Sequence, residues 1–246
     1  MLVFYLQDAL EAIPRYHDQD DTCFDLRAPE APTKLKKRSP LADARIVRLL
    51  VPLVVIVLLL IAWEGRRELS LDHKLSGVAG EIAGRKVNVD CPGFLRGLID
   101  ISGHGGSVRF NADGTPGNTT HLETHVCHSL STYGKTRKSA DFACVFGTSP
   151  CSDKVERTVY AVVVLSHESQ HLRGIRSESE AQCYALQTTA LVAERLGSPP
   201  DEAKAVAAHY LAVDQPRMPE DYSLPDGCVD GGSLDLNPES SGWPSG

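Results

Sequence analysis

The sequence has no excess of basic residues. Its 25 Lys and Arg residues are outnumbered by 32 Asp and Glu residues, which gives a formal net charge of −7. Nucleic-acid-binding proteins normally present a basic face, so this balance argues against nucleic acid as a partner. Glycine-rich segments lack the glycine spacing and the following Lys of a phosphate-binding loop, and Cys-x-x-Cys pairs are absent. A P-loop is therefore excluded, and a zinc site made of thiolates has no support.

One apolar run is present, but it is short. Leu49 to Trp63 is a run of fifteen uncharged residues, fewer than the roughly 20 expected for a membrane-spanning helix. Ile46 and Val47 extend the run if Arg48 reaches the lipid head groups, and Trp63 suits the far interface. We therefore predict a single transmembrane helix over residues 45–64. A buried core helix is the alternative.

The charges around this run predict its orientation. Basic residues gather before it, at Lys34, Lys36, Lys37, Arg38, Arg45 and Arg48. By the positive-inside rule, the N-terminus is cytoplasmic and the C-terminal domain lies outside the cell membrane. Residues 1–44 are predicted to be a disordered cytoplasmic tail, 65–85 a charged helical or linker segment, and 86–246 an exported domain. A cleaved signal peptide is the alternative to the anchor, although 48 residues precede the run.

The cysteines follow the same division. Cys23 precedes the apolar run and the other six cysteines follow it. An even number of cysteines after an export segment predicts disulfides, and six cysteines allow 15 pairings. The preferred set is Cys144–Cys151 as a local loop, Cys91–Cys127, and Cys183–Cys228.

The segment His167-Glu168-Ser169-Gln170-His171 is an H-E-x-x-H motif. On a helix, residues four apart share a face, so both imidazoles can reach one metal ion with the intervening Glu beside it. Zinc accepts imidazole nitrogen at about 2.0–2.1 Å and is usually tetrahedral. The preceding run, residues 155–165, is rich in β-branched residues and suits either a buried helix or a strand.

The motif and the residues after it resemble zincin-type zinc metallopeptidases. The chain follows the metzincin pattern as far as Gly174 and then has Ser177 where that family has its last His. A closer resemblance is to the Glu-type zincins (gluzincins), which implies a Glu as third ligand on the next helix, and Glu178 is the preferred candidate. Glu180 is the competitor, but Ser177-x-x-Glu180 is a capping box and gives Glu180 a structural role. The resemblance covers about 30 residues and places the chain in no particular family.

The fold expected is α+β: a zincin-like helix pair with a small β-sheet, preceded by the transmembrane helix. Strands are predicted at 87–91 and 107–110, and helices at 178–196 and from about 200 to 213. His121, His125 and His128 form a second histidine cluster, for which a structural or solvated role is favoured over a metal site. His209, Tyr210 and Tyr222 are candidates for a hydrogen bond to the transition state.

The expected function is that of a membrane-anchored, outward-facing zinc peptidase. Zn²⁺ held by His167, His171 and Glu178 would activate a water, and Glu168 would be the general base. The substrate would be a peptide or protein that the sequence does not identify. The alternative is a non-catalytic surface domain in which the metal is structural or has been lost.

Overall fold

The structure is a computed structural model, and it describes residues 40–92, 105–147, 149–240 and 242–244. The chain divides into two compact units, Met1–Val51 and Pro52–Gly246. In the first unit the described part is helical and belongs to α1 (Pro40–Ala83), so residues 40–44 of the predicted tail are helical. The remainder of that tail, with Cys23, lies outside the described residues.

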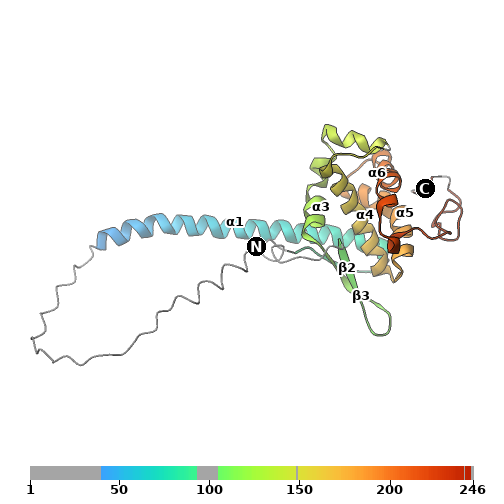
Figure 1. Cartoon of the computed structure of the whole chain (residues 1–246). Helices are drawn as coiled ribbons and strands as arrows, with labels where there is room; N and C mark the ends of the chain where they lie inside the picture. The colour runs from blue at the N-terminus through green and yellow to red at the C-terminus, as the bar shows by residue number, and fades with distance from the viewer. Residues whose placement is uncertain (1–39, 93–104, 148, 241, 245–246) are drawn as a thin grey trace, which may run out of the picture. The chain divides into compact units, whose positions relative to one another are not determined.

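The second unit contains a bundle of helices and a small sheet. After α1 come β1 (Asn88–Asp90), β2 (Gly106–Phe110), β3 (Pro116–Leu122), α3 (Thr124–Thr136), the 3-10 helix η1 (Ala140–Phe146), α4 (Asp153–Arg173), α5 (Glu178–Leu196), α6 (Pro200–Val213) and the 3-10 turns η2 (Gln215–Arg217) and η3 (Glu220–Tyr222). Figure 1 shows α3, α4, α5 and α6 side by side, with β2 and β3 next to α4. The predicted α+β class is confirmed.

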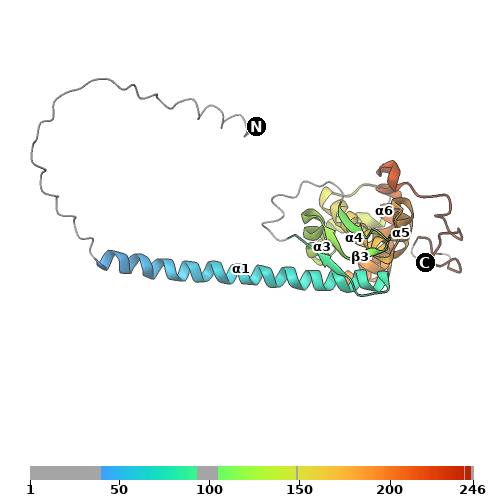
Figure 2. The same cartoon turned by 90° about the horizontal axis from the view of Figure 1, so that it is seen from below.

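The sheet has the strand order β1-β3-β2, with β1 parallel and β2 antiparallel to β3. β2 and β3 pack on α4, and Figure 2 shows β3 next to that helix. Among the described residues, β2 is an edge strand, because it pairs with β3 on one side and with no strand on the other. The H-E-x-x-H motif on α4 therefore lies beneath an edge strand.

Helix α4 is the centre of the second unit. Its neighbours α3, α5, β2 and β3 cover it so fully that every residue from 161 to 172, which includes the motif, is buried. The β-branched run Val162–Val164 would suit a strand, but the signals at the two ends of α4 favour a helix. Asp153 and Glu156 lie in its first turn, and Gly174 caps its C-terminus. The choice that the sequence left open between helix and strand is therefore resolved as a helix.

The segment predicted as a charged helical or linker segment, 65–85, is the C-terminal part of α1. Leu75, Val78 and Ala79 of this part are buried in the same core as Val159 of α4. Directly after the helix, an Arg85 guanidinium nitrogen donates to the carbonyls of Leu172 (2.8 Å) and Gly117 (2.7 Å). The segment thus contributes to the folded unit and ties the end of α4 to β3.

The predicted anchor, residues 45–64, is helical throughout within α1. The apolar side chains described between Leu50 and Leu59 are exposed. None of the described helices qualifies as a membrane span.

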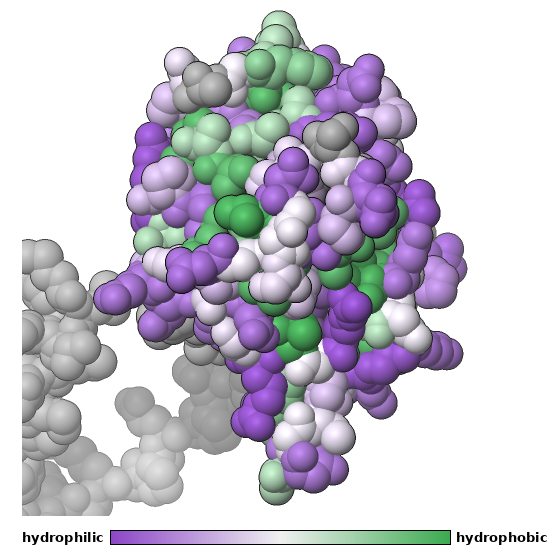
Figure 3. All heavy atoms as spheres, turned by 90° about the vertical axis from the view of Figure 1, so that its right-hand side faces the viewer, coloured by the Kyte–Doolittle hydropathy of each residue, from purple (hydrophilic) through white to green (hydrophobic). Residues whose placement is uncertain are grey.

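The described cysteines form three disulfides, and these are the three pairs predicted. The Cα–Cα distances are 5.8 Å for Cys91–Cys127, 5.6 Å for Cys144–Cys151 and 5.8 Å for Cys183–Cys228. The last bridge fixes the irregular C-terminal segment to α5. Figure 3 shows the face of the unit on that side, where hydrophilic side chains are interspersed with small hydrophobic areas.

The second histidine cluster is divided between a strand and a helix. His121 belongs to β3, where its Nδ1 lies 2.8 Å from Asp90 of the adjacent strand β1. His125 lies one element later, on α3, and its Nδ1 is 3.1 Å from Glu123. The strand β3 was missed because Pro116 and Gly117 at its start are typical of turns. His121 and His125 therefore do not share a helical face.

Candidate metal centre

The turn between α4 and α5 builds the site. Gly174 ends α4 in the left-handed conformation (φ 118°), and the Ile175 N–H donates back to the Gln170 carbonyl at 3.1 Å. This turn brings the Ile175 carbonyl to 2.7 Å from Nδ1 of His171. Ser177 then begins α5 as its N-cap, accepting from the Glu180 N–H. Glu178, the first residue of α5, consequently faces the end of α4.

Three side-chain atoms converge at this point. Nε2 of His167 lies 3.0 Å from Nε2 of His171, and Glu178 Oε2 lies 2.9 Å from the first and 3.3 Å from the second. The two imidazoles are each 6% exposed. Ligand atoms held tetrahedrally at about 2.0–2.1 Å from a zinc ion are about 3.3–3.4 Å apart. Small movements of the three side chains would therefore place their atoms at three corners of a tetrahedral zinc site.

The hydrogen bonds on the other ring nitrogens orient both imidazoles toward this point. Nδ1 of His167 faces Oε1 of Gln182 at 3.0 Å, and Nδ1 of His171 faces the Ile175 carbonyl. Both partners accept hydrogen bonds, so each Nδ1 carries a proton, and an imidazole in its neutral form then presents a lone pair at Nε2. Two lone pairs and a carboxylate oxygen then point at one another. A proton can bridge two of these atoms, whereas a divalent cation satisfies all three.

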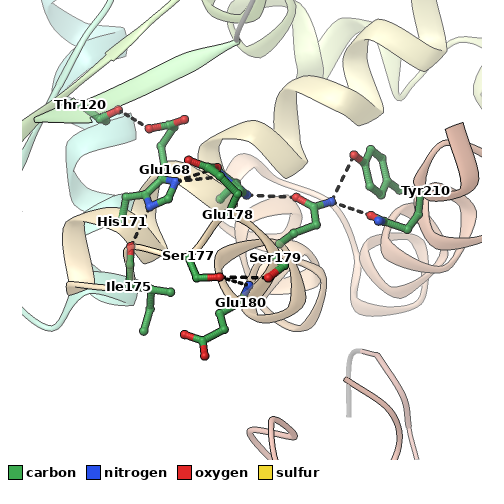
Figure 4. Close-up of polar contacts among 12 residues, drawn as sticks. Thr120, Glu168, His171, Ile175, Ser177, Glu178, Ser179, Glu180 and Tyr210 are labelled. Carbon is green, nitrogen blue, oxygen red and sulfur yellow. Dashed lines mark hydrogen bonds and ion pairs between the residues drawn. The ribbon is translucent and has the colours of Figure 1, made fainter. Parts of the chain in front are cut away.

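The structure brings Glu178, not Glu180, to the histidines. Figure 4 shows Glu178 directed toward His171 while Glu180 points away from it. Glu180 is exposed, and its backbone N–H completes the cap at Ser177. The contacts with His167 and His171 hold the pKa of Glu178 well below its usual range, so this carboxylate stays ionised at neutral pH.

Glu168 lies beside the three ligand atoms without joining them. It is 4% exposed, and its Oε2 accepts a hydrogen bond from the Thr120 hydroxyl on β3 at 3.2 Å. A side chain at Gly106 on β2 would place its Cβ 2.7 Å from Glu168 Cγ, so only glycine lets the strand pass this close. Burial raises the pKa of Glu168, and the nearby histidines and the Thr120 hydrogen bond oppose the shift in part. A carboxylate of raised pKa is a better base at neutral pH.

A chain of amides behind His167 was not foreseen from the sequence. Gln182 Nε2 donates to Gln215 Oε1 at 2.7 Å and to the Tyr210 hydroxyl at 3.3 Å, which turns Oε1 of Gln182 toward His167. Gln215 in turn donates to the Tyr222 carbonyl at 2.9 Å. Gln182 lies one helical turn after Glu178, and this i, i+4 spacing was a usable signal. Gln215 and Thr120 are distant in sequence and gave none.

We expect Gln182→Leu to weaken zinc binding by about 10- to 100-fold, because groups that orient a metal-bound histidine contribute on that scale. The variant removes the acceptor that keeps the proton on Nδ1 of His167. Competition with a chromophoric chelator measures the affinity. Gln187→Leu is the control, since Gln187 lies on the same helix but bonds Leu234 and Leu236 of the C-terminal segment. Equal zinc affinity in Gln182→Leu and wild type would contradict this role.

Two cavities open on the site. One, of about 540 Å³, has a wall of mixed polarity that includes Tyr160, Val163, Tyr210, Met218 and Tyr222. The other, of about 370 Å³, is lined by β2 residues together with His171, Arg176 and Tyr222. Glu168 and Glu178 line both cavities, so a bound molecule could extend to either side of the ligand atoms.

The three proposed hydrogen-bond donors occupy different places. Tyr222 lines both cavities, and its ring lies 5.5 Å from that of His167. Burial raises the pKa of its hydroxyl to about 12, so the proton is retained at neutral pH. Tyr210 lines one cavity and bonds Gln182, and His209 lies away from the site beside Glu156.

A second group of potential ligands, Cys151, Glu156 and His209, also lies within ligand-to-ligand distance. Its sulfur is bonded to Cys144, so no thiolate is present there. The His209 Nδ1 is 3.1 Å from the Gly147 carbonyl, and its Nε2 is 3.3 Å from Glu156. The Gly147 carbonyl and Glu156 thus engage both ring nitrogens of His209, so the group requires no metal.

No protein-family model matches this chain, and no curated protein or solved structure shows significant similarity to it.

Proposed function

We propose that this chain is a zinc-dependent peptidase that hydrolyses peptide bonds. The observation that carries the proposal is the convergence of His167, His171 and Glu178 on one point, with the buried carboxylate of Glu168 beside them. Three protein ligands leave a tetrahedral zinc site one open position, as in catalytic sites, whereas structural sites are closed by four. When bound, zinc would supply a Lewis acid that polarises a carbonyl and lowers the pKa of a water to about 7.

Glu168 supplies the proton transfers. Its Oε2 is held by Thr120, which leaves Oε1 free, within the described part of the chain, to take a proton from the attacking water. The same carboxyl group then passes that proton to the leaving amine. Its burial excludes bulk water from this exchange and keeps the carboxyl in one place.

Tyr222 is positioned to stabilise the negative charge that develops on the substrate carbonyl oxygen. It lies at the junction of the two cavities, and its hydroxyl retains its proton at neutral pH. A protonated hydroxyl can donate a hydrogen bond to an oxyanion. Of the three donors that the sequence suggested, Tyr222 is the one that borders both cavities.

The proposed place of action is outside the cell. The domain contains three disulfides. Because disulfides form and persist in oxidising compartments, they support export of the domain. The basic residues before the apolar run support the same orientation.

Metal removal tests the proposed function. The purified chain is expected to hold about one zinc per molecule, because among the described residues one group of three converging ligands has no disulfide-bonded member. Treatment with a chelator should reduce the hydrolysis of a peptide library to background, and added zinc should restore it. Circular dichroism serves as the control, because the core and disulfides are expected to keep the fold without metal. Hydrolysis that continues after the metal is gone would refute the proposal.

A further inference from the structure

Arg173 and Arg176 flank the turn that connects α4 to α5, and they differ in whether they line a cavity at the site. The Arg173 guanidinium lies 5.9 Å from the ring centre of Tyr184, and the Arg176 guanidinium lies 5.3 Å from that of Phe110. Both side chains are exposed. Arg176, however, lines the 370 Å³ cavity that contains Glu168 and His171, and Arg173 does not.

The position of Arg176 is fixed from two sides. The Phe110 ring, on β2, lies against the guanidinium and also faces His171, with 6.2 Å between ring centres. On the other side is the turn between β2 and β3, where a Cβ on Gly114 would lie 3.2 Å from an Arg176 terminal nitrogen. Stacking on an aromatic face orients a guanidinium while leaving its N–H groups available. The side chain is therefore held in place at the cavity wall with its donors unused.

Among the residues that the structure describes, no anion pairs with this guanidinium. Within the described part of the chain, Arg176 makes no hydrogen bond or ion pair, and its contact is with the Phe110 ring. The two carboxylates that line the same cavity are engaged: Glu178 bonds both histidines and Glu168 bonds Thr120. Asp113, in the adjacent turn, accepts hydrogen bonds from Thr115. A cation that is positioned but unpaired at the wall of a substrate-sized cavity is suited to bind an anion from outside.

We infer that Arg176 is a specificity residue that binds a carboxylate of the peptide substrate, and this inference rests on the proposed function. An Arg fork matches the geometry of a carboxylate, which it can bind through two parallel hydrogen bonds. The carboxylate can come from an acidic side chain near the scissile bond or from the C-terminus of a short peptide. Both present the same group to Arg176, and the experiment separates them.

The probes are dansylated alanine pentapeptides in which one position is Asp or Asn, each made with a free and an amidated C-terminus. Binding to the zinc-loaded full chain is measured by fluorescence anisotropy, and cleavage by mass spectrometry. We expect one Asp position, or the free C-terminus, to improve both affinity and kcat/KM by about 10- to 100-fold over the neutral partner, the range for a charge-assisted pair. An effect of Asp identifies a side chain, and an effect of the free terminus identifies the chain end.

Three variants assign the effect to Arg176. In Arg176→Glu the favoured peptides should fall to the level of their neutral partners. Arg176→Lys should keep part of the preference, because the charge remains without the fork. Arg173→Glu is the matched control, with the same charge reversal outside the cavity, and should keep the preference in full.

The outcomes separate this inference from the proposed function. Binding that depends on a carboxylate and on Arg176, without cleavage of any peptide, would support the anion site and count against the peptidase. Cleavage with equal rates for Asp and Asn peptides, and for free and amidated ends, would overturn the inference while leaving the peptidase. A carboxylate preference that survives in Arg176→Glu would also overturn it, as would the absence of binding to every probe.

Discussion

Replacement of Glu168 by Gln should leave the zinc content unchanged and lower kcat by about 10²–10⁴-fold, the usual contribution of a general base. The amide has nearly the same shape, so it can still accept from Thr120 and fit beneath Gly106. It cannot take a proton from water. Because Glu168 is not among the three converging ligand atoms, the metal is expected to remain.

Two measurements decide this prediction: zinc content by elemental analysis, and kcat on any peptide that the wild type cleaves. Glu180→Gln is the control, because it makes the same chemical change at an exposed carboxylate on the next helix. Loss of zinc in Glu168→Gln would show that Glu168 is a ligand. An unchanged kcat would refute the proposed role of Glu168 as general base.

Local signals were sufficient for much of the fold. The helix predicted at 178–196 is α5, because Ser177 and Gly197 mark its ends through their own side-chain and backbone preferences. The same holds for α6, which begins at Pro200. The sheet was harder to predict, because β3 pairs with β1 in parallel across a separation of about thirty residues, and no turn signal specifies that pairing.

The burial of the C-terminal half of α1 illustrates a second limit. Charged residues surround Leu75, Val78 and Ala79, so the composition of this segment resembles that of a linker. The three residues nevertheless share one helical face, which packs into the core. Amphipathic spacing was the available signal, and the high charge concealed it.

The candidate site divides in the same way. His167, Glu168 and His171 lie on one helix, and helical geometry predicts that they meet. Glu178 lies on the next helix, and its role was implied by the resemblance to Glu-type zincins. The residues that tune them come from elsewhere: Thr120 from β3 and Gln215 from beyond α6. Motif spacing predicts the ligand atoms, but only tertiary packing determines what fixes their protonation and orientation.

The choice between Glu178 and Glu180 gives the second large effect. Glu178→Ala should reduce zinc affinity by more than about 10²-fold, beyond the usual loss for a supporting residue, because it removes one of three ligand atoms. Hydrolysis should be lost with the metal. Glu180→Ala should keep the zinc and cost at most about 1 kcal/mol of stability, since this side chain only favours the N-terminus of α5.

Zinc titration against a chromophoric chelator, combined with urea unfolding of the metal-free chains, separates the two roles. The unfolding data matter because Glu178 also lies in the first turn of α5, so its removal can weaken the helix as well as the site. If Glu178→Ala loses zinc affinity while its unfolding midpoint matches that of Glu180→Ala, the loss is due to the missing ligand and not to a loosened helix. Retained affinity in Glu178→Ala together with lost affinity in Glu180→Ala would place the third ligand two residues later and require α5 to rotate in the metal-bound state.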